Sequence, residues 1–207
     1  YNMEAHKVFS TPVLQTKPCS FTQEELNIVQ KEKNNLMDNF GKNFSTRDTY
    51  VFKKLPKMYD FCNATLQHYV KDILKVNPKI DFYITQSWIN YNPKESFHHA
   101  HFHPNSLLSG VLAIQNDSNI PLMLDRPHAT KIFDNLLAIY DYSELNEFNS
   151  PKMSFSLPTG SLILFPSKIF HDVPKNDTSE DRITLAFNTF IRGDIGGPED
   201  FLGKLHI

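Results

Sequence analysis

From about residue 79 onward, the chain consists of short runs of β-branched and aromatic residues separated by turn signals. The runs cover 82–92, 107–114, 136–142, 161–165 and 182–191. Each has the length and composition of a β-strand, and clusters of Asn, Asp, Ser, Pro and Gly lie between them. This half of the chain therefore has to bury its strands in an all-β sandwich or barrel.

Two helices are predicted ahead of these strands. Thr22 and Glu25 have the spacing of a capping box, so we expect a helix over 22–40. Apolar residues at helical spacing predict a second helix over 56–76, with Pro56 in its first turn. Both helices are expected to brace the sheet.

The composition fits one sizeable core. Hydrophobic residues make up 40% of the 207 residues, and 17 Phe and 8 Tyr against 7 Gly favour sheets over a helical bundle. Lys and Arg number 21 against 23 acidic residues, so no basic excess indicates nucleic acid or a membrane surface. We expect one domain, with an N-terminal segment at 1–78, a β core at 79–192 and a tail at 193–207.

The cysteines and the hydropathy pattern indicate a compartment. Cys19 and Cys62 form no CxxC pair, which supports neither a zinc knuckle nor a disulfide framework, so both are expected to be reduced thiols. No run approaches the ~18 apolar residues that a membrane span needs. The stretch 1–10 carries charges where a signal peptide would be apolar. We expect a soluble, cytoplasmic protein.

Four of the nine histidines lie between His98 and His103. In a β-strand, the alternation of side chains would place His99, His101 and His103 on one face. Neutral imidazole is the commonest transition-metal ligand, and two histidines at i and i+2 of a strand can reach one ion. The pattern predicts a metal site, and the alternative is a solvated loop that happens to be rich in histidine.

Two further residues have the chemistry to complete such a site. His171 follows the predicted strand 161–165, although a lone histidine there is more often a satisfied surface or core residue. Arg182 shares a strand face with Thr184 and Asn188. An arginine among small and polar groups can make a bidentate contact with a carboxylate, and the plainer interpretation is a surface ion pair.

The order of these motifs resembles the 2-oxoglutarate and iron(II)-dependent oxygenases. It is most similar to a branch that is related to prolyl hydroxylases and found in phages and marine bacteria. In chain order, the motifs are Trp88 to Pro93, His101 with His103 and Pro104, Ser109 with Gly110, Pro158 with Gly160, Phe165 with Pro166, His171, and Asp181 with Arg182. The resemblance covers roughly 82–192. It implies a double-stranded β-helix, a jelly roll of two facing sheets, with iron(II) at one open end.

The resemblance also implies roles for individual residues. His101 and His171 match the two metal histidines, and Arg182 matches the basic residue that clamps the distal carboxylate of 2-oxoglutarate. Three more residues occupy positions where relatives place polar contacts to the cosubstrate. These are Thr184, Asn90 and Asn188.

The chain departs from the family pattern at His103, where the family has a carboxylate two residues after the first histidine. We expect His103 to be the third ligand, with His98 and His99 as alternatives. Three histidines leave the same open coordination positions as two histidines and a carboxylate. Loss of the anionic ligand raises the net positive charge of the site by one.

The implied activity couples oxidative decarboxylation of 2-oxoglutarate to hydroxylation of an unidentified substrate, with molecular oxygen as co-reactant. If the chain is phage-encoded, the reaction is expected in the cytoplasm of the host cell. Two alternatives stay open: a cupin-like dioxygenase with three histidines and no 2-oxoglutarate, and a non-catalytic jelly-roll module that binds zinc. Arg182 discriminates between the 2-oxoglutarate-dependent oxygenase and the cupin-like dioxygenase, because only the 2-oxoglutarate-dependent enzyme requires Arg182 to face the metal cavity.

Overall fold

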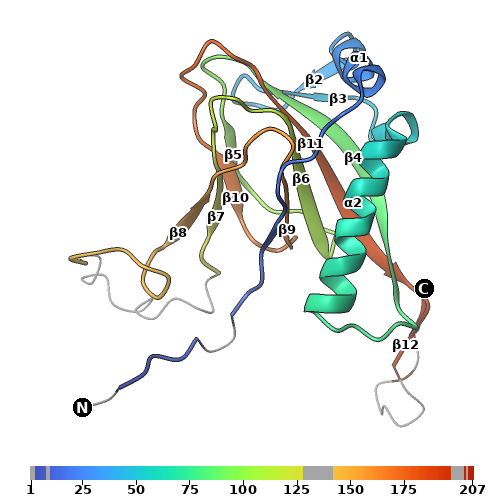
Figure 1. Ribbon diagram of the computed structural model, residues 1–207, viewed down its shortest axis with the longest axis vertical. Helices are drawn as coiled ribbons and strands as arrows, with labels where there is room; N and C mark the ends of the chain where they lie inside the picture. The colour runs from blue at the N-terminus through green and yellow to red at the C-terminus, as the bar shows by residue number, and fades with distance from the viewer. Residues whose placement is uncertain (1–2, 8–9, 128–141, 197–202, 204) are drawn as a thin grey trace.

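The computed structural model describes residues 3–7, 10–127, 142–196, 203 and 205–207. The strands of the described residues form two main sheets that face each other (Figure 1). The predicted strand at 136–142 lies outside the described residues except for Tyr142, which is not in a strand.

The larger sheet has seven strands in the order β1-β9-β6-β11-β4-β3-β2. In chain order these are β1 (Leu14–Gln15), β2 (Leu36–Asp38), β3 (Phe44–Thr46), β4 (Asp81–Asn92), β6 (Leu108–Gln115), β9 (Leu162–Pro166) and β11 (Arg182–Arg192). The four strands predicted at 82–92, 107–114, 161–165 and 182–191 are confirmed as β4, β6, β9 and β11. All neighbours in this sheet pair antiparallel.

The smaller sheet has four strands in the order β5-β10-β7-β8, also antiparallel. They are β5 (His98–His101), β7 (Leu122–Asp125), β8 (Lys152–Phe155) and β10 (His171–Val173). The histidine alternation indicated a strand at β5, whereas β7, β8 and β10 were not predicted, because three or four residues are too few to show a periodicity. A short ladder of β12 (Asp194–Ile195) and β13 (Leu205–His206) lies in the predicted C-terminal tail. The two main sheets have the expected jelly-roll arrangement.

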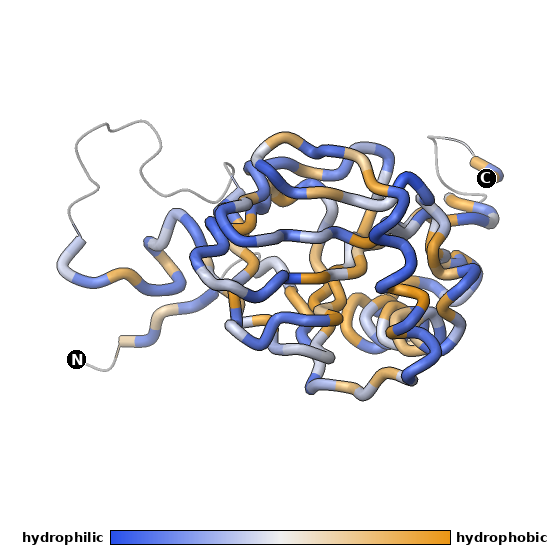
Figure 2. The backbone as a smooth tube through the Cα atoms, turned by 90° about the horizontal axis from the view of Figure 1, so that it is seen from above, coloured by the Kyte–Doolittle hydropathy of each residue, from blue (hydrophilic) through white to orange (hydrophobic). Residues whose placement is uncertain are grey.

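Helices cover the face of the larger sheet that is turned away from the smaller one (Figure 1). They are α1 (Gln23–Glu32), the 3-10 turn η1 (Val51–Lys54), α2 (Pro56–His68) and the π-helical turn η2 (Tyr69–Ile73). The second predicted helix is confirmed, since α2 and η2 together span most of 56–76. Viewed from above in Figure 2, hydrophobic stretches gather inside the molecule.

Each face of the larger sheet packs into its own core. In β11, Ile183, Leu185 and Phe187 point to the helices and belong to a core shared with α2. Between the two sheets lies a second core, to which β6 contributes Val111 and Ala113. The alternation predicted for β11 therefore holds, and Arg182 and its face-mates point into the space between the sheets.

The first predicted helix is correct at its start and wrong at its end. Thr22 Oγ1 accepts a hydrogen bond from the N–H of Glu25 at 3.3 Å, as the capping box requires. The helix ends at Glu32, not at residue 40. The residues that follow form β2, which pairs with β3 and extends the larger sheet. Backbone pairing within the β2–β3 hairpin overrides weak helix propensity here.

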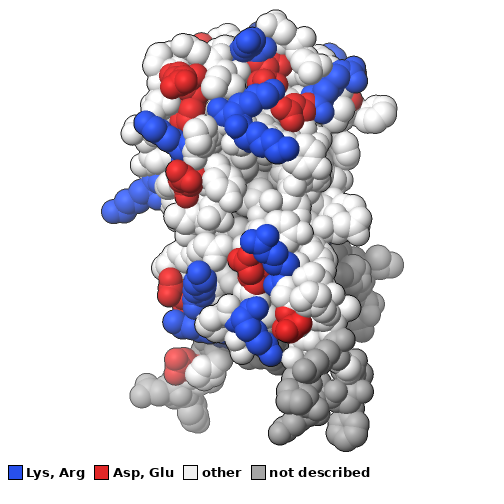
Figure 3. Space-filling view, turned by 90° about the vertical axis from the view of Figure 1, so that its right-hand side faces the viewer, with Lys and Arg blue, Asp and Glu red and all other residues white. Residues whose placement is uncertain are grey.

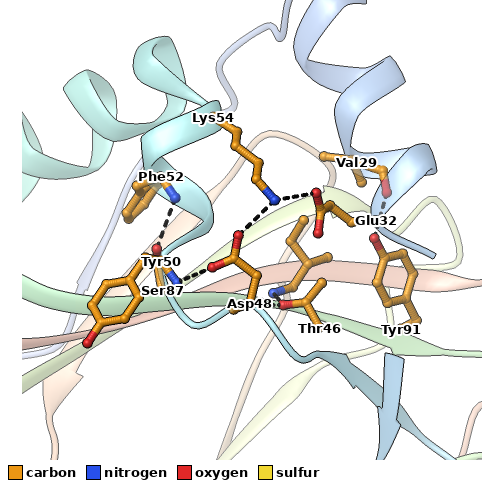
Figure 4. A network of polar contacts seen from close by, with 10 residues as sticks. Val29, Glu32, Thr46, Asp48, Tyr50, Phe52, Lys54, Ser87 and Tyr91 are labelled. Atoms are coloured by element: carbon orange, nitrogen blue, oxygen red, sulfur yellow. Dashed lines mark hydrogen bonds and ion pairs between the residues drawn. The ribbon is translucent and has the colours of Figure 1, made fainter. Parts of the chain in front are cut away.

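The N-terminal segment is attached to the larger sheet by partnered polar groups (Figure 4). Lys54 Nζ lies 2.8 Å from Glu32 Oε1 and 2.8 Å from Asp48 Oδ2. The hydroxyl of Tyr91 donates to the carbonyl of Val29 at 2.6 Å. We call this group the N-terminal polar network; its members are Val29, Glu32, Thr46, Asp48, Phe52, Lys54, Ser87, Ile89 and Tyr91.

The surface on the helix side carries no field of a single sign. Figure 3 shows Lys and Arg interspersed with Asp and Glu on this face, with an uncharged band between the upper and lower groups. None of the helices in the described part of the chain is long and apolar enough to cross a membrane. Cys19 and Cys62 are free thiols, as predicted.

Candidate metal centre

The structure brings the three predicted metal ligands together between the sheets. His101 ends β5 and His171 begins β10, and the two are directly paired across these strands. His103 lies two residues beyond β5, where its N–H donates to the carbonyl of Ser167 at 3.0 Å. The candidate ligand atoms of the three histidines all lie within 4.8 Å of one another.

Each of these histidines has its Nδ1 engaged by an oxygen. The partners are the carbonyl of His99 for His101 at 2.9 Å, the side-chain oxygen of Asn188 for His103 at 2.6 Å, and the carbonyl of Ile169 for His171 at 3.1 Å. A carbonyl oxygen can only accept, so each Nδ1 carries the proton. Each Nε2 then presents a lone pair, which is the form that binds a metal.

The convergence of these lone pairs favours a cation between them. Nε2 of His103 lies 3.2 Å from Nε2 of His171. Two acceptors at that distance repel each other unless a positive charge lies between them. Nitrogens that share one ion at about 2.0–2.1 Å each are separated by roughly 3 Å. The three imidazoles therefore fit a metal ion.

Burial keeps the imidazoles neutral. Removal from water, reinforced by the neighbouring imidazoles, lowers the pKa of His171 to about 2 and that of His103 to about 4. Burial also lowers the pKa of His101. Neutral imidazole is the metal-binding form, so the site does not have to release protons near neutral pH.

The predicted grouping of His99 with the ligands is wrong, and His98 takes its place. The pairing of β5 with β10 shifts register, with His171 opposite His101 and Val173 opposite His98. The four residues 98–101 of β5 therefore lie opposite the three residues 171–173 of β10, and such a bulge reverses the alternation of side chains. His98 lines the cavity and stacks on His101 with ring centroids 4.3 Å apart, whereas His99 is exposed.

Asn188 contacts His103 and Ser109 in the structure, and its predicted contact with the cosubstrate stays a prediction. Its side-chain oxygen accepts from His103 Nδ1 at 2.6 Å and from the hydroxyl of Ser109 at 3.0 Å. A hydroxyl contact of 2.8 Å links Ser109 onward to Ser167, whose carbonyl holds the backbone of His103. Asn188 thus orients the imidazole of His103 and fixes its tautomer.

Arg182 lies in the same cavity as the histidines. It is 2% exposed, and its Nε and Nη2 have no hydrogen-bond partner. Burial lowers its pKa to about 10, which still leaves the guanidinium charged near neutral pH. Nε and Nη2 form the side-on edge of the guanidinium that binds a carboxylate through two parallel hydrogen bonds.

The two other predicted cosubstrate contacts also line this space, which we call the metal cavity. Thr184 and Asn90 are cross-strand partners on β11 and β4, and Asn90 accepts a hydrogen bond from Trp88 Nε1 at 3.2 Å. The polar and aromatic residues that line the metal cavity are Trp88, Asn90, Asn92, His98, His101, His103, His171, Arg182 and Thr184.

Sequence reasoning missed Asn92, which lines the metal cavity and is 1% exposed. Its position could have been found, because Trp88, Asn90 and Asn92 alternate along β4 and share one face. No acidic side chain joins the three histidines in the described part of the chain. Asp172, next to His171, instead forms an ion pair with Lys152.

Comparison with known proteins agrees with this geometry. Residues 86–188 match the family described as "Putative 2OG-Fe(II) oxygenase". The chain belongs to the 2-oxoglutarate and iron(II)-dependent oxygenases. No protein of curated function matches the chain in sequence.

Solved structures share the fold at low sequence identity. A 2OG-Fe(II) oxygenase family oxidoreductase from Burkholderia pseudomallei is 14% identical with a TM-score of 0.56, over 86% of this chain and 83% of that one. A prolyl-4-hydroxylase from Pseudomonas putida is 13% identical with a TM-score of 0.54, over 86% and 93%. HygX from Streptomyces hygroscopicus, solved with nickel, 2-oxoglutarate and hygromycin B, is 13% identical with a TM-score of 0.54, over 86% and 82%.

Proposed function

We propose that this oxygenase binds iron(II) through His101, His103 and His171 and hydroxylates a second substrate at the expense of 2-oxoglutarate. One observation carries the proposal: three metal-binding nitrogens share a cavity with a buried guanidinium whose carboxylate-binding edge has no partner. A metal site alone would not require that arginine. A structural arginine would be paired within the protein.

Different residues are assigned to metal binding and to cosubstrate binding. His101, His103 and His171 hold the metal, and Asn188 keeps His103 in the required tautomer. Arg182 would hold the distal carboxylate of 2-oxoglutarate, and its place in the same cavity as the histidines would orient the bound cosubstrate. When bound, iron(II) and 2-oxoglutarate together supply the oxidising power, with oxygen consumed and succinate and carbon dioxide released as the substrate gains a hydroxyl group.

Burial of the cavity contributes to the reaction. Arg182 and His171 are 2% and 4% exposed. In such a water-poor space, hydrogen bonds and charges act more strongly than in water.

The test is an anaerobic titration of the iron(II)-loaded protein with 2-oxoglutarate, followed by absorption spectroscopy. We expect the weak visible charge-transfer band that chelation produces, and succinate once oxygen is admitted. The control variant Arg192→Ala should give the same band and the same succinate as the wild type. Arg192 lies on the same strand as Arg182 but pairs with Asp81 on the surface at 2.7 Å. Absence of both the band and succinate contradicts the proposal.

A three-histidine dioxygenase that uses no 2-oxoglutarate is the second candidate, and the histidine in place of the family carboxylate favours it. Oxygen consumption that does not depend on 2-oxoglutarate would support that activity. Tightly retained zinc with no turnover would instead support a non-catalytic module. Metal analysis of the purified protein separates these outcomes.

We further propose that the protein acts in the cytoplasm, in that of a host cell if the gene belongs to a phage. The free thiols Cys19 and Cys62 and the need for reduced iron support a reducing compartment. Fractionation of cells that express the tagged protein tests this.

A further inference from the structure

A second polar side chain without a partner lies beside Arg182 in the metal cavity. Asn92 on β4 is the cross-strand partner of Arg182 on β11, and both residues line the cavity. Asn92 is 1% exposed, and neither its Nδ2 nor its Oδ1 has a hydrogen-bond partner. A buried amide without partners costs free energy, so it needs an explanation.

The geometry of the strand pair places both side chains on one face. Cross-strand partners in an antiparallel pair have Cβ atoms roughly 4.5–5.5 Å apart. A group held on the side-on edge of Arg182 is therefore within reach of the Asn92 amide. A carboxylate has about four lone-pair sites, and a bidentate arginine uses two of them.

We propose that Asn92 donates a further hydrogen bond from Nδ2 to the distal carboxylate of 2-oxoglutarate and so selects a dicarboxylic cosubstrate. This inference rests on the proposed function. The distal carboxylate would then be the hydrogen-bond partner that both Asn92 and the side-on edge of Arg182 lack within the protein. The proposed contact also makes the preference for a dicarboxylate depend on an amide within the Trp88 to Pro93 motif to which the sequence analysis assigned no role.

The chain offers a matched control in Asn43. This residue is also 1% exposed, and both of its side-chain polar atoms also lack partners. It directly precedes β3, which pairs with β4, but it does not line the metal cavity. Asn43→Ala removes the same chemical group from a similar environment outside the binding site.

The experiment measures anaerobic binding to the iron(II)-loaded protein for two keto acids. 2-Oxopentanoate chelates through the same keto acid group as 2-oxoglutarate but has a methyl group in place of the distal carboxylate. We expect Asn92→Ala to weaken 2-oxoglutarate binding by about 10- to 100-fold, as loss of a hydrogen bond to a charged group does. Binding of 2-oxopentanoate should change by less than about twofold, and Asn43→Ala should leave both affinities unchanged.

Asn92→Asp gives an independent test with nearly unchanged side-chain volume. The new carboxylate would take the free edge of Arg182 itself. We expect 2-oxoglutarate affinity to fall by more than about 100-fold, since the arginine is blocked and like charges oppose each other. The melting temperature of the ligand-free protein should rise, because a buried unpaired cation gains a partner.

The outcomes separate this inference from the proposed function. If the wild-type protein fails to bind 2-oxoglutarate, the proposed function fails. If the wild type binds but Asn92→Asp binds equally well, only the inference fails. It also fails if Asn92→Ala weakens both keto acids equally, or if Asn43→Ala weakens 2-oxoglutarate as much, since the effect is then one of packing.

Discussion

Two groups of polar side chains lie on opposite faces of the larger sheet, and they differ in how far the protein satisfies them. In the N-terminal polar network, Lys54 has two carboxylate partners and the Tyr91 hydroxyl has a carbonyl (Figure 4). In the metal cavity, the edge of Arg182 and both polar atoms of Asn92 have no partner.

The difference shows what each group is for. A polar group that is paired inside the protein stabilises the fold, and its free bonding capacity is used up. A buried group left unpaired costs stability, and in a cavity its free bonding capacity is available to a ligand. We therefore expect substitutions in the network to lower stability without changing binding, and substitutions in the cavity to weaken binding without lowering stability.

The largest effect is expected for His171→Ala. Loss of this ligand should abolish specific iron(II) binding and turnover, because only two imidazoles would remain. Equilibrium dialysis with iron(II) measures the binding, and circular dichroism checks that the fold persists. His68→Ala is the control, since His68 pairs with Asp72 on the surface of α2. A fully unfolded His171→Ala protein would show that this residue is structural.

Arg182→Met should weaken 2-oxoglutarate binding by tens to about a thousandfold. Breaking a buried charged pair costs about 2–5 kcal/mol, and about 1.4 kcal/mol corresponds to tenfold. Iron(II) affinity should stay unchanged. Stability should be unchanged or higher without the cosubstrate, because an unpaired buried charge is replaced by an apolar side chain of similar size.

The measurements are the 2-oxoglutarate dependence of succinate formation and a urea unfolding curve. Arg192→Met on the same strand serves as control. Identical succinate curves for the Arg182 variant and the wild type would remove Arg182 from the site. A large loss of stability would place it with the structural network instead.

Asn188→Ala should lower iron(II) affinity by about 10- to 100-fold, the usual cost of losing a group that orients a metal ligand. His103 would lose the acceptor for its Nδ1 proton and could adopt the other tautomer. Competition with a chelator measures the affinity. Asn39→Ala is the control, because its amide donates to Ser45 away from the metal. Equal affinities for wild type and Asn188→Ala would mean that backbone contacts alone orient His103.

The smallest effect is expected in the N-terminal polar network. Tyr91→Phe removes the hydrogen bond to the carbonyl of Val29 and should lower the free energy of unfolding by about 1–2 kcal/mol. Urea unfolding measures this loss. Iron(II) and 2-oxoglutarate affinities should match those of the wild type. A change in binding without a change in stability would break the distinction between the two regions.

Much of the architecture follows from the sequence because the signals are local. The alternation along β11 placed Arg182 and Ile183 on opposite faces before any fold was known, and both faces are as predicted. The capping box located the start of α1. The order of His101, His103, His171 and Arg182 indicated the family, and the fold brings these residues into one cavity.

The folded structure decided what depends on the pairing of one strand with another. The end of α1 depends on the ladder between β2 and β3. His98 lines the metal cavity in place of His99 because β5 has a bulge where it pairs with β10.

The roles of two asparagines were likewise decided in three dimensions. Asn188 and Asn92 are the same residue type, yet the side chain of Asn188 is hydrogen-bonded to His103 and that of Asn92 has no hydrogen-bond partner. Side-chain periodicity is a property of one strand and can be read along it. Register, bulges and hydrogen-bond partners are properties of two strands together, so only the folded chain determines them.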